Sequence, residues 1–118
     1  MTLTPLVPTT VLKDPRGVEL EDWGPLPEGT GEPMRTAGKV LWKGDGNLEA
    51  GLWECDPGPS RWLFETNESI TMFSGLMLVT EDGGQAYEIK AGDSAVFPKG
   101  WSGTWDIRET VFKFYTAF

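Results

Sequence analysis

The residue types that usually carry chemistry in small proteins are scarce in this chain. Its 118 residues include no histidine and a single cysteine, Cys55. Without histidine, a Ser-His-Asp or Cys-His catalytic arrangement is impossible. A single cysteine forms no intramolecular disulfide and has no partner for zinc-type coordination, so we interpret Cys55 as a buried, inert thiol. The candidates that remain are carboxylates, amines, phenols and aromatic rings.

The C-terminal segment 110–117 places an amine and a phenol on one face of a strand. Alternation along the strand groups Lys113 and Tyr115 with Val111, and it puts Phe112 and Phe114 on the other face. One of these faces must point inward.

Tryptophan is unusually frequent for so short a chain, and each indole buries on the order of 150 to 250 Å². The six are Trp23, Trp42, Trp53, Trp62, Trp101 and Trp105. Trp42 and Trp53 lie within strands that we expect at 37–43 and 48–55, and we interpret both as core residues. For Trp62 and Trp105, filling a pocket and stacking on a flat ligand are both open, and Trp101 is a candidate for a subunit contact.

Charge and hydropathy exclude several partner classes. A formal net charge of -8 and a pI near 4.4 disfavour nucleic acid and anionic membrane surfaces, since both would repel the chain. The N-terminal residues do not resemble a secretion signal, and no run approaches the roughly 18 apolar residues of a membrane helix. We expect a cytoplasmic protein.

The chain divides into two segments of different composition. Residues 1–35 contain six prolines, which predict an extended N-terminal arm whose apolar residues pack on the body or on a neighbouring subunit. Residues 36–118 form one domain of short β-like runs separated by Gly, Asp, Asn and Pro turns. Strands are predicted at 37–43, 48–55, 60–66, 69–80, 85–90, 94–97, 103–107 and 110–117. The pattern predicts an all-β antiparallel sandwich or barrel, of which the jelly roll is one form.

One glycine and proline pattern is specific enough to suggest a family. Gly92 is followed after five residues by Pro98, Lys99 and Gly100, which is the first half of the second cupin motif. In that motif a histidine and an asparagine follow, and here these positions hold Gly103 and Ile107.

The first cupin motif is also only partly kept. Glu68 and Gly75 have its glutamate-to-glycine spacing, whereas its His-x-His pair falls on Trp62 and Phe64. Together with GLWEC, TEDGG and a C-terminal KFY, residues 51–118 resemble a branch of small uncharacterised cupins. That branch is similar to the cupin domains of ureidoglycine aminohydrolases and of an ethanolamine-utilisation protein.

The resemblance implies an antiparallel double-stranded β-helix, the cupin jelly roll, with a pocket at the barrel mouth and frequently a homodimer. Three of the four usual metal positions hold residues that do not bind metal, so we expect no metal and no cofactor. The resemblance also turns Lys113 and Tyr115 inward, near Glu68, and places Trp105 on the interior with Trp62.

This arrangement has two interpretations. In the first, Glu68 and Lys113 form a structural ion pair that Tyr115 helps to satisfy, because either charge buried alone would cost several kcal/mol. In the second, these three groups orient a small ligand or act on it as acid and base.

The sequence therefore predicts a small-molecule-binding module. Its predicted pocket residues are Trp62, Phe64, Glu68, Trp105, Lys113 and Tyr115. An alternative is an enzyme of nitrogen or carbohydrate metabolism, similar to an aminohydrolase or to metal-independent epimerases, that uses Glu68, Lys113 and Tyr115. A structural or dimerising accessory protein is the third possibility.

Overall fold

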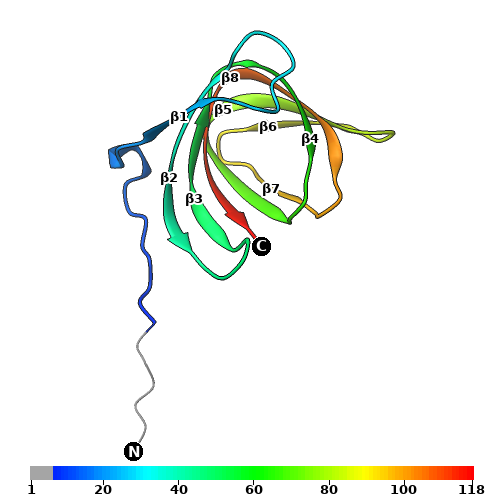
Figure 1. The fold of residues 1–118 in the computed structure, drawn as a ribbon. Helices are drawn as coiled ribbons and strands as arrows, with labels where there is room; N and C mark the ends of the chain where they lie inside the picture. The colour runs from blue at the N-terminus through cyan, green and yellow to red at the C-terminus, as the bar shows by residue number, and fades with distance from the viewer. Residues whose placement is uncertain (1–6) are drawn as a thin grey trace, which may run out of the picture.

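A computed structural model describes residues 7–118, and the first six residues of the predicted arm lie outside the described residues. The fold is an antiparallel β-sheet that curls into a barrel (Figure 1). Between residues 7 and 118 the only helical segment is a short 3-10 turn, η1 (Pro15–Gly17). The strands are β1 (Glu21–Pro25), β2 (Arg35–Lys43), β3 (Glu49–Cys55), β4 (Gly58–Leu63), β5 (Glu68–Glu81), β6 (Ala86–Lys90), β7 (Ser94–Phe97) and β8 (Ser102–Ala117). The predicted jelly-roll class is confirmed.

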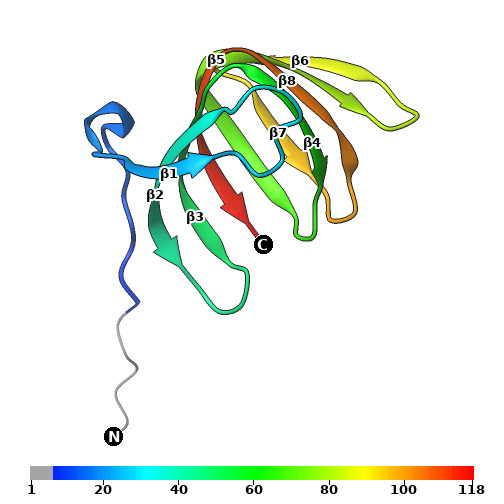
Figure 2. The same cartoon turned by 45° about the horizontal axis from the view of Figure 1, so that its top comes forward.

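Two long strands organise the barrel. β5 and β8 pair with each other along most of their length, from Glu68 opposite Ala117 to Glu81 opposite Gly103. The remaining partners divide between the halves of these strands: β7 and β6 pair with the two halves of β5, and β3 and β4 pair with the two halves of β8. The long strands therefore belong to both walls of the barrel, which encloses an interior between them (Figure 2).

A glycine lets β5 bend where it passes from one wall to the other. The pairing of β5 with β8 shifts register on both sides of Gly75, which has a φ of 105°. A Cβ at this position would collide with the carbonyl oxygen of Thr110 and lie 2.8 Å from the Cα of Val111. Only glycine meets both requirements, which explains the role of this motif residue.

The structure corrects one prediction about the strands. Segments 103–107 and 110–117 were expected to be separate, yet they form the single strand β8. The residues between them, Arg108 and Glu109, are exposed and polar, which interrupts the apolar alternation. The pairing with β5 shifts register at Arg108 but continues on both sides of it.

The N-terminal segment adds an edge strand and a cover to the barrel. β1 pairs only with β2, so Pro25 lies where no further ladder bond is needed. The loop that follows β1 runs beside β4, where the Thr30 N–H donates to the Pro59 carbonyl and the Arg61 N–H donates to the Glu28 carbonyl. Leu26 and Met34 at its ends are buried in the core. Part of this proline-rich segment therefore packs on the body of the same chain.

The core lies between the two walls. It is built from the inward residues of β5, β6, β7 and β8, together with Trp62 of β4 and Phe64 just after it. Its buried members include Ile70, Met72, Met77, Val79, Ile89, Phe97, Trp105, Ile107 and Val111. In the described part of the chain, no helix is long and apolar enough to cross a membrane.

Candidate functional site

Aromatic side chains fill the part of the interior where the cupin motifs would hold a metal. We call this group the aromatic cluster, and its members are Trp53, Trp62, Phe64, Phe97, Trp101 and Trp105. The rings of Trp62 and Trp105 lie closest together, with centroids 4.4 Å apart, because Trp62 pairs with Gly103 two residues before Trp105. The predicted inward direction of Trp105 is confirmed, since it is fully buried.

One polar atom of this cluster has no partner. The Trp62 Nε1–H donates to Ser60 Oγ at 2.7 Å, and the Ser60 hydroxyl donates to the Trp105 carbonyl at 3.3 Å. The indole N–H of Trp105 itself is the only buried side-chain polar atom of residues 7–118 without a hydrogen bond.

Gly103 occupies the position of the missing histidine, and the structure leaves no room there for a side chain. A Cβ on Gly103 would collide with the carbonyl oxygen of Thr80 and lie 2.6 Å from the ring of Trp101. The position has therefore become a close contact between β8 and β5, with the Trp101 ring packed over it.

Lys113 and Glu68 come together as predicted. The Lys113 ammonium lies 3.3 Å from Glu68 Oε2, with exposed side-chain fractions of 3% for the lysine and 19% for the glutamate. The ammonium also faces two indole rings, 4.4 Å from the centroid of Trp53 and 4.6 Å from that of Trp105. Cation–π contacts of this kind strengthen when they are desolvated. The charge is thus satisfied by one carboxylate and two ring faces.

The prediction that Tyr115 helps to satisfy the Glu68–Lys113 pair is wrong in its choice of partner. The Tyr115 hydroxyl donates to Glu49 Oε2 at 2.6 Å. Glu49 and Tyr115 lie on the paired strands β3 and β8, where Gly51 is directly opposite Tyr115. The absence of a side chain on Gly51 leaves room for the phenol, since a Cβ there would lie 2.9 Å from its oxygen.

Burial dominates the ionisation of this region. Desolvation lowers the pKa of Lys113, and the nearby Glu68 carboxylate opposes that shift. Burial, followed by the charge of Asp56, raises the pKa of Cys55 to about 12. Burial and the hydrogen bond to Glu49 raise the pKa of Tyr115. Cys55 therefore stays a neutral thiol at physiological pH, as expected of an inert cysteine.

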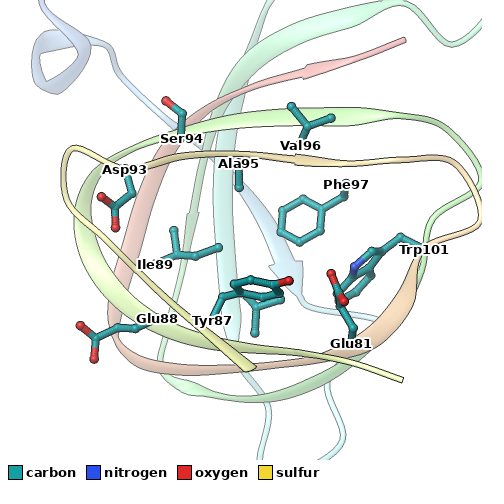
Figure 3. A pocket seen from close by; sticks show the side chains of 11 residues that line it. Glu81, Tyr87, Glu88, Ile89, Asp93, Ser94, Ala95, Val96, Phe97 and Trp101 are labelled. Atoms are coloured by element: carbon teal, nitrogen blue, oxygen red, sulfur yellow. The ribbon is translucent and has the colours of Figure 1, made fainter. Parts of the chain in front are cut away.

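A pocket opens beside the aromatic cluster, between β6 and β7. This β6–β7 pocket has a volume of about 400 Å³. Its lining residues are Val79, Glu81, Tyr87, Glu88, Ile89, Asp93, Ser94, Ala95, Val96, Phe97 and Trp101. Figure 3 shows Tyr87, Ile89, Ala95, Phe97 and Trp101 around one open pocket, which Glu81 also lines.

The pocket exists because two neighbouring strands diverge. β6 and β7 each pair with β5 but with different halves of it, Leu76–Thr80 and Glu68–Thr71. A tight turn at Gly92, which has a φ of 91°, joins the two strands at one side only. The gap that opens away from this turn leaves inward residues partly uncovered. Tyr87 is opposite Val79 on the inner face, yet it is 46% exposed.

None of the six sequence-predicted pocket residues lines the β6–β7 pocket. Phe64, Trp62 and Trp105 lie behind it, and Phe97 joins the two regions because it contacts Phe64 and Trp105 and also lines the pocket. A direct contact of the six residues with a ligand stays a prediction.

Sequence reasoning missed Glu81, Tyr87 and Phe97 as site residues. The signal that was available is the alternation of the predicted strand 85–90, which puts Tyr87 and Ile89 on one face. The cupin motifs point instead to the positions that hold a metal in that family, which are occupied here by Trp62, Phe64 and Gly103.

A metal site has no support in the described residues. Between residues 7 and 118, no group of three or more carboxylate or thiol ligands comes together. Glu68, the one motif ligand that remains, is engaged by Lys113. The residues present therefore do not fit the metal that the cupin motifs would hold.

Comparisons with known proteins show the same architecture. A comparison with curated proteins finds no match. Among solved structures, a DUF861-family protein of unknown function from Pseudomonas syringae pv. tomato superposes with a TM-score of 0.79 at 18% identity, covering 87% of this chain and 46% of that chain. This chain thus spans less than half the length of that protein. The EutQ protein of Clostridium difficile superposes with a TM-score of 0.70 at 17% identity, covering 86% and 80%.

Sequence likeness is higher over a shorter span for a third protein. A DUF861-family protein from Thermotoga maritima is 36% identical, with 57% of this chain and 76% of that chain covered and a TM-score of 0.55. The predicted resemblance to the ethanolamine-utilisation branch is confirmed, whereas no comparison tests the likeness to ureidoglycine aminohydrolases. The family model described as the EutQ-like cupin domain matches residues 42–115, and the chain belongs to that family.

Proposed function

We propose that this cupin domain is a binding module that takes a small molecule in the β6–β7 pocket. The observation that carries the proposal is the pocket itself, because its volume of about 400 Å³ lies in the range of small-molecule sites. Its walls combine apolar and aromatic side chains with polar ones in about equal exposed area, and polar groups in a small-molecule site fix the orientation of the ligand.

The aromatic cluster supports this pocket as a rigid rear wall. Phe97 stacks on Phe64 with an interplanar angle of 10°, and Trp101 packs edge-on against both. A ligand would therefore meet ring faces that are already held in place, which reduces the entropy lost on binding.

Binding has more support than the enzymatic alternative. That alternative requires Glu68, Lys113 and Tyr115 to reach a substrate, yet the Lys113 ammonium lies against Glu68 and two indoles, and the Tyr115 hydroxyl is bonded to Glu49. None of the three lines the pocket. The homodimer and the cytoplasmic location stay predictions.

The test fills the pocket without disturbing its walls. Ala95 points into the pocket from β7 (Figure 3), whereas Val40 on β2 is 38% exposed and does not line the pocket. A thermal-shift screen with a chemically mixed set of small molecules is run on the wild type, Ala95→Leu and the control Val40→Leu.

We expect compounds that raise the wild-type melting temperature to act equally on Val40→Leu and to lose their effect on Ala95→Leu. The proposal fails if no compound stabilises the wild type, or if the stabilising compounds act undiminished on Ala95→Leu.

A further inference from the structure

The charges around the β6–β7 pocket all have one sign. Among its lining residues, the groups that are charged at neutral pH are the carboxylates of Glu81, Glu88 and Asp93. Between residues 7 and 118, none of the three takes part in an ion pair. The net charge of -8 adds to the negative potential at the opening. An anionic ligand would be repelled from this site.

The carboxylates differ in where they point. Glu81 follows Val79 by two residues on β5 and shares its inward face, and it lines the pocket together with Tyr87 and Trp101. The Asp93 carboxylate lies across the enclosed space, and one of its oxygens accepts the backbone N–H of Lys90 at 3.0 Å. Glu88 points away on the outer face of β6. Glu81 is thus the free carboxylate that faces the pocket.

Three aromatic rings accompany this carboxylate. Tyr87, Phe97 and Trp101 line the pocket, and the partly exposed Tyr87 presents its ring to the opening. The faces of such rings carry partial negative charge and attract organic cations, most strongly where water is excluded. The chain already uses this chemistry nearby, where the Lys113 ammonium lies between the rings of Trp53 and Trp105.

We propose that the β6–β7 pocket selects an organic ammonium ion, with the charged nitrogen against Glu81 and the rings of Tyr87 and Trp101, and the alkyl part on Val79, Ile89 and Phe97. This inference rests on the proposed function and adds the chemical class of the ligand.

A metal cation fits the pocket less well than an organic one. The two inward carboxylates lie on different sides of the enclosed space (Figure 3), and the described residues bring no three such ligands together. The apolar residues between them offer nothing to a hard cation, which requires six or more oxygen ligands. They do offer burial to the methyl and methylene groups of an organic ammonium.

The experiment compares three probes of nearly equal shape and different charge. They are choline, its neutral isostere 3,3-dimethylbutan-1-ol and the anion 3,3-dimethylbutanoate. Binding is measured by chemical-shift titration of the wild-type protein, so that the resonances of β6 and β7 also report the location. We expect choline to bind at least about fivefold more tightly than the neutral alcohol, a ratio within the range of cation–π contacts, and the anion to bind weakest.

Two charge-matched variants assign the preference to one side chain. Glu81→Gln removes the inward carboxylate, and Glu109→Gln removes one negative charge from an exposed position of β8 that does not line the pocket. We expect Glu81→Gln to lower the ratio of choline to alcohol affinity about threefold or more, and Glu109→Gln to leave it unchanged. If the affinity ratio falls equally in both variants, the preference for the cation comes from the net charge of the molecule, and the role of Glu81 is overturned.

The outcomes separate the two proposals. If the neutral alcohol binds in the pocket as tightly as choline, the cation inference is overturned while the binding module survives. If choline shifts no resonance of β6 or β7 at millimolar concentration, the cation inference is likewise overturned. The binding module itself falls if no compound of the mixed screen stabilises the wild type, or if the stabilising compounds act undiminished on Ala95→Leu.

Discussion

The aromatic cluster and the β6–β7 pocket are built on the same long strands, yet one is filled and the other open. In the cluster, β4 and β8 pair side by side, and the indoles of Trp62 and Trp105 occupy the space between the walls. At the pocket, β6 and β7 part from each other, and Tyr87 is left half-exposed. The comparison teaches that packed indoles fill the part of the barrel where the cupin motifs would hold a metal, whereas a pocket remains open where the strand pairing itself leaves a gap.

The largest expected effect is the loss of an indole from the filled region. Trp105 has no exposed surface and contacts the rings of Trp53, Trp62 and Phe97. We expect Trp105→Ala to lower the free energy of unfolding by about 3 to 5 kcal/mol, because it leaves a cavity that the rigid neighbours cannot fill. Denaturant unfolding followed by circular dichroism measures the change.

The matched control is an aromatic residue of the open region. Tyr87→Ala is expected to lower the free energy of unfolding by less than about 1 kcal/mol, since the Tyr87 ring is already half in solvent. Equal losses in the two variants would show that the division into a filled and an open region is wrong.

The ion pair tests the filled region in a second way. Glu68→Gln leaves the Lys113 ammonium, which is 3% exposed, with only two ring faces to stabilise it. We expect the free energy of unfolding to fall by about 2 to 4 kcal/mol at neutral pH, because an unpaired buried charge is costly. Equilibrium unfolding in urea provides the measurement.

Removing the lysine instead distinguishes a structural pair from a working site. Lys113→Met deletes the buried charge and keeps an apolar chain of similar length, so the loss should be smaller than for Glu68→Gln. Ligands of the β6–β7 pocket should bind this variant as they bind the wild type. If these ligands no longer bind to a folded Lys113→Met protein, Lys113 belongs to the binding site, and the location proposed for the ligand is wrong.

Much of this fold follows from the sequence because its turns are chemically specific. Gly92 and Pro98 mark the bounds of a short strand, and the structure has β7 at the predicted residues 94–97. Alternation along the last strand grouped Lys113 with Tyr115, and the resemblance to cupins turned that face inward, where Lys113 meets Glu68. The strand bounds and the grouping depend on local backbone rules and a period of two, which a single sequence contains.

The pocket could not be predicted because it depends on how strands separate in space. Nothing in residues 85–97 alone shows that β6 and β7 pair with different halves of β5, and without that divergence Tyr87 would be covered. The partner of Tyr115 was missed for a related reason. Glu49 is brought to the phenol by the pairing of β3 with β8, which the sequence pattern does not fix.

The smallest predicted effect concerns Cys55, whose ionisation reports how dry the filled region is. Burial raises its pKa from 9.0 to about 12. Between these values the folded chain keeps the thiol proton and the unfolded chain loses it, so the stabilising contribution of Cys55 falls as pH rises above about 9. We expect the difference in unfolding free energy between the wild type and Cys55→Ala to shrink above pH 9, by at most about 1.4 kcal/mol per pH unit.

A matched cavity variant without a titratable group isolates this effect. Val111 is paired with Cys55 across β3 and β8 and is equally buried, so Val111→Ala opens a comparable space at the same place. The lowered pKa of Lys113 and the raised pKa of Tyr115 act on the stability of all three proteins, so they contribute little to the differences between them. The cost of Val111→Ala should therefore stay nearly constant from pH 8 to pH 10.5, while that of Cys55→Ala declines. A parallel course for both variants would mean that water reaches the thiol, and the region around Lys113 would then be less closed than the packing of its rings indicates.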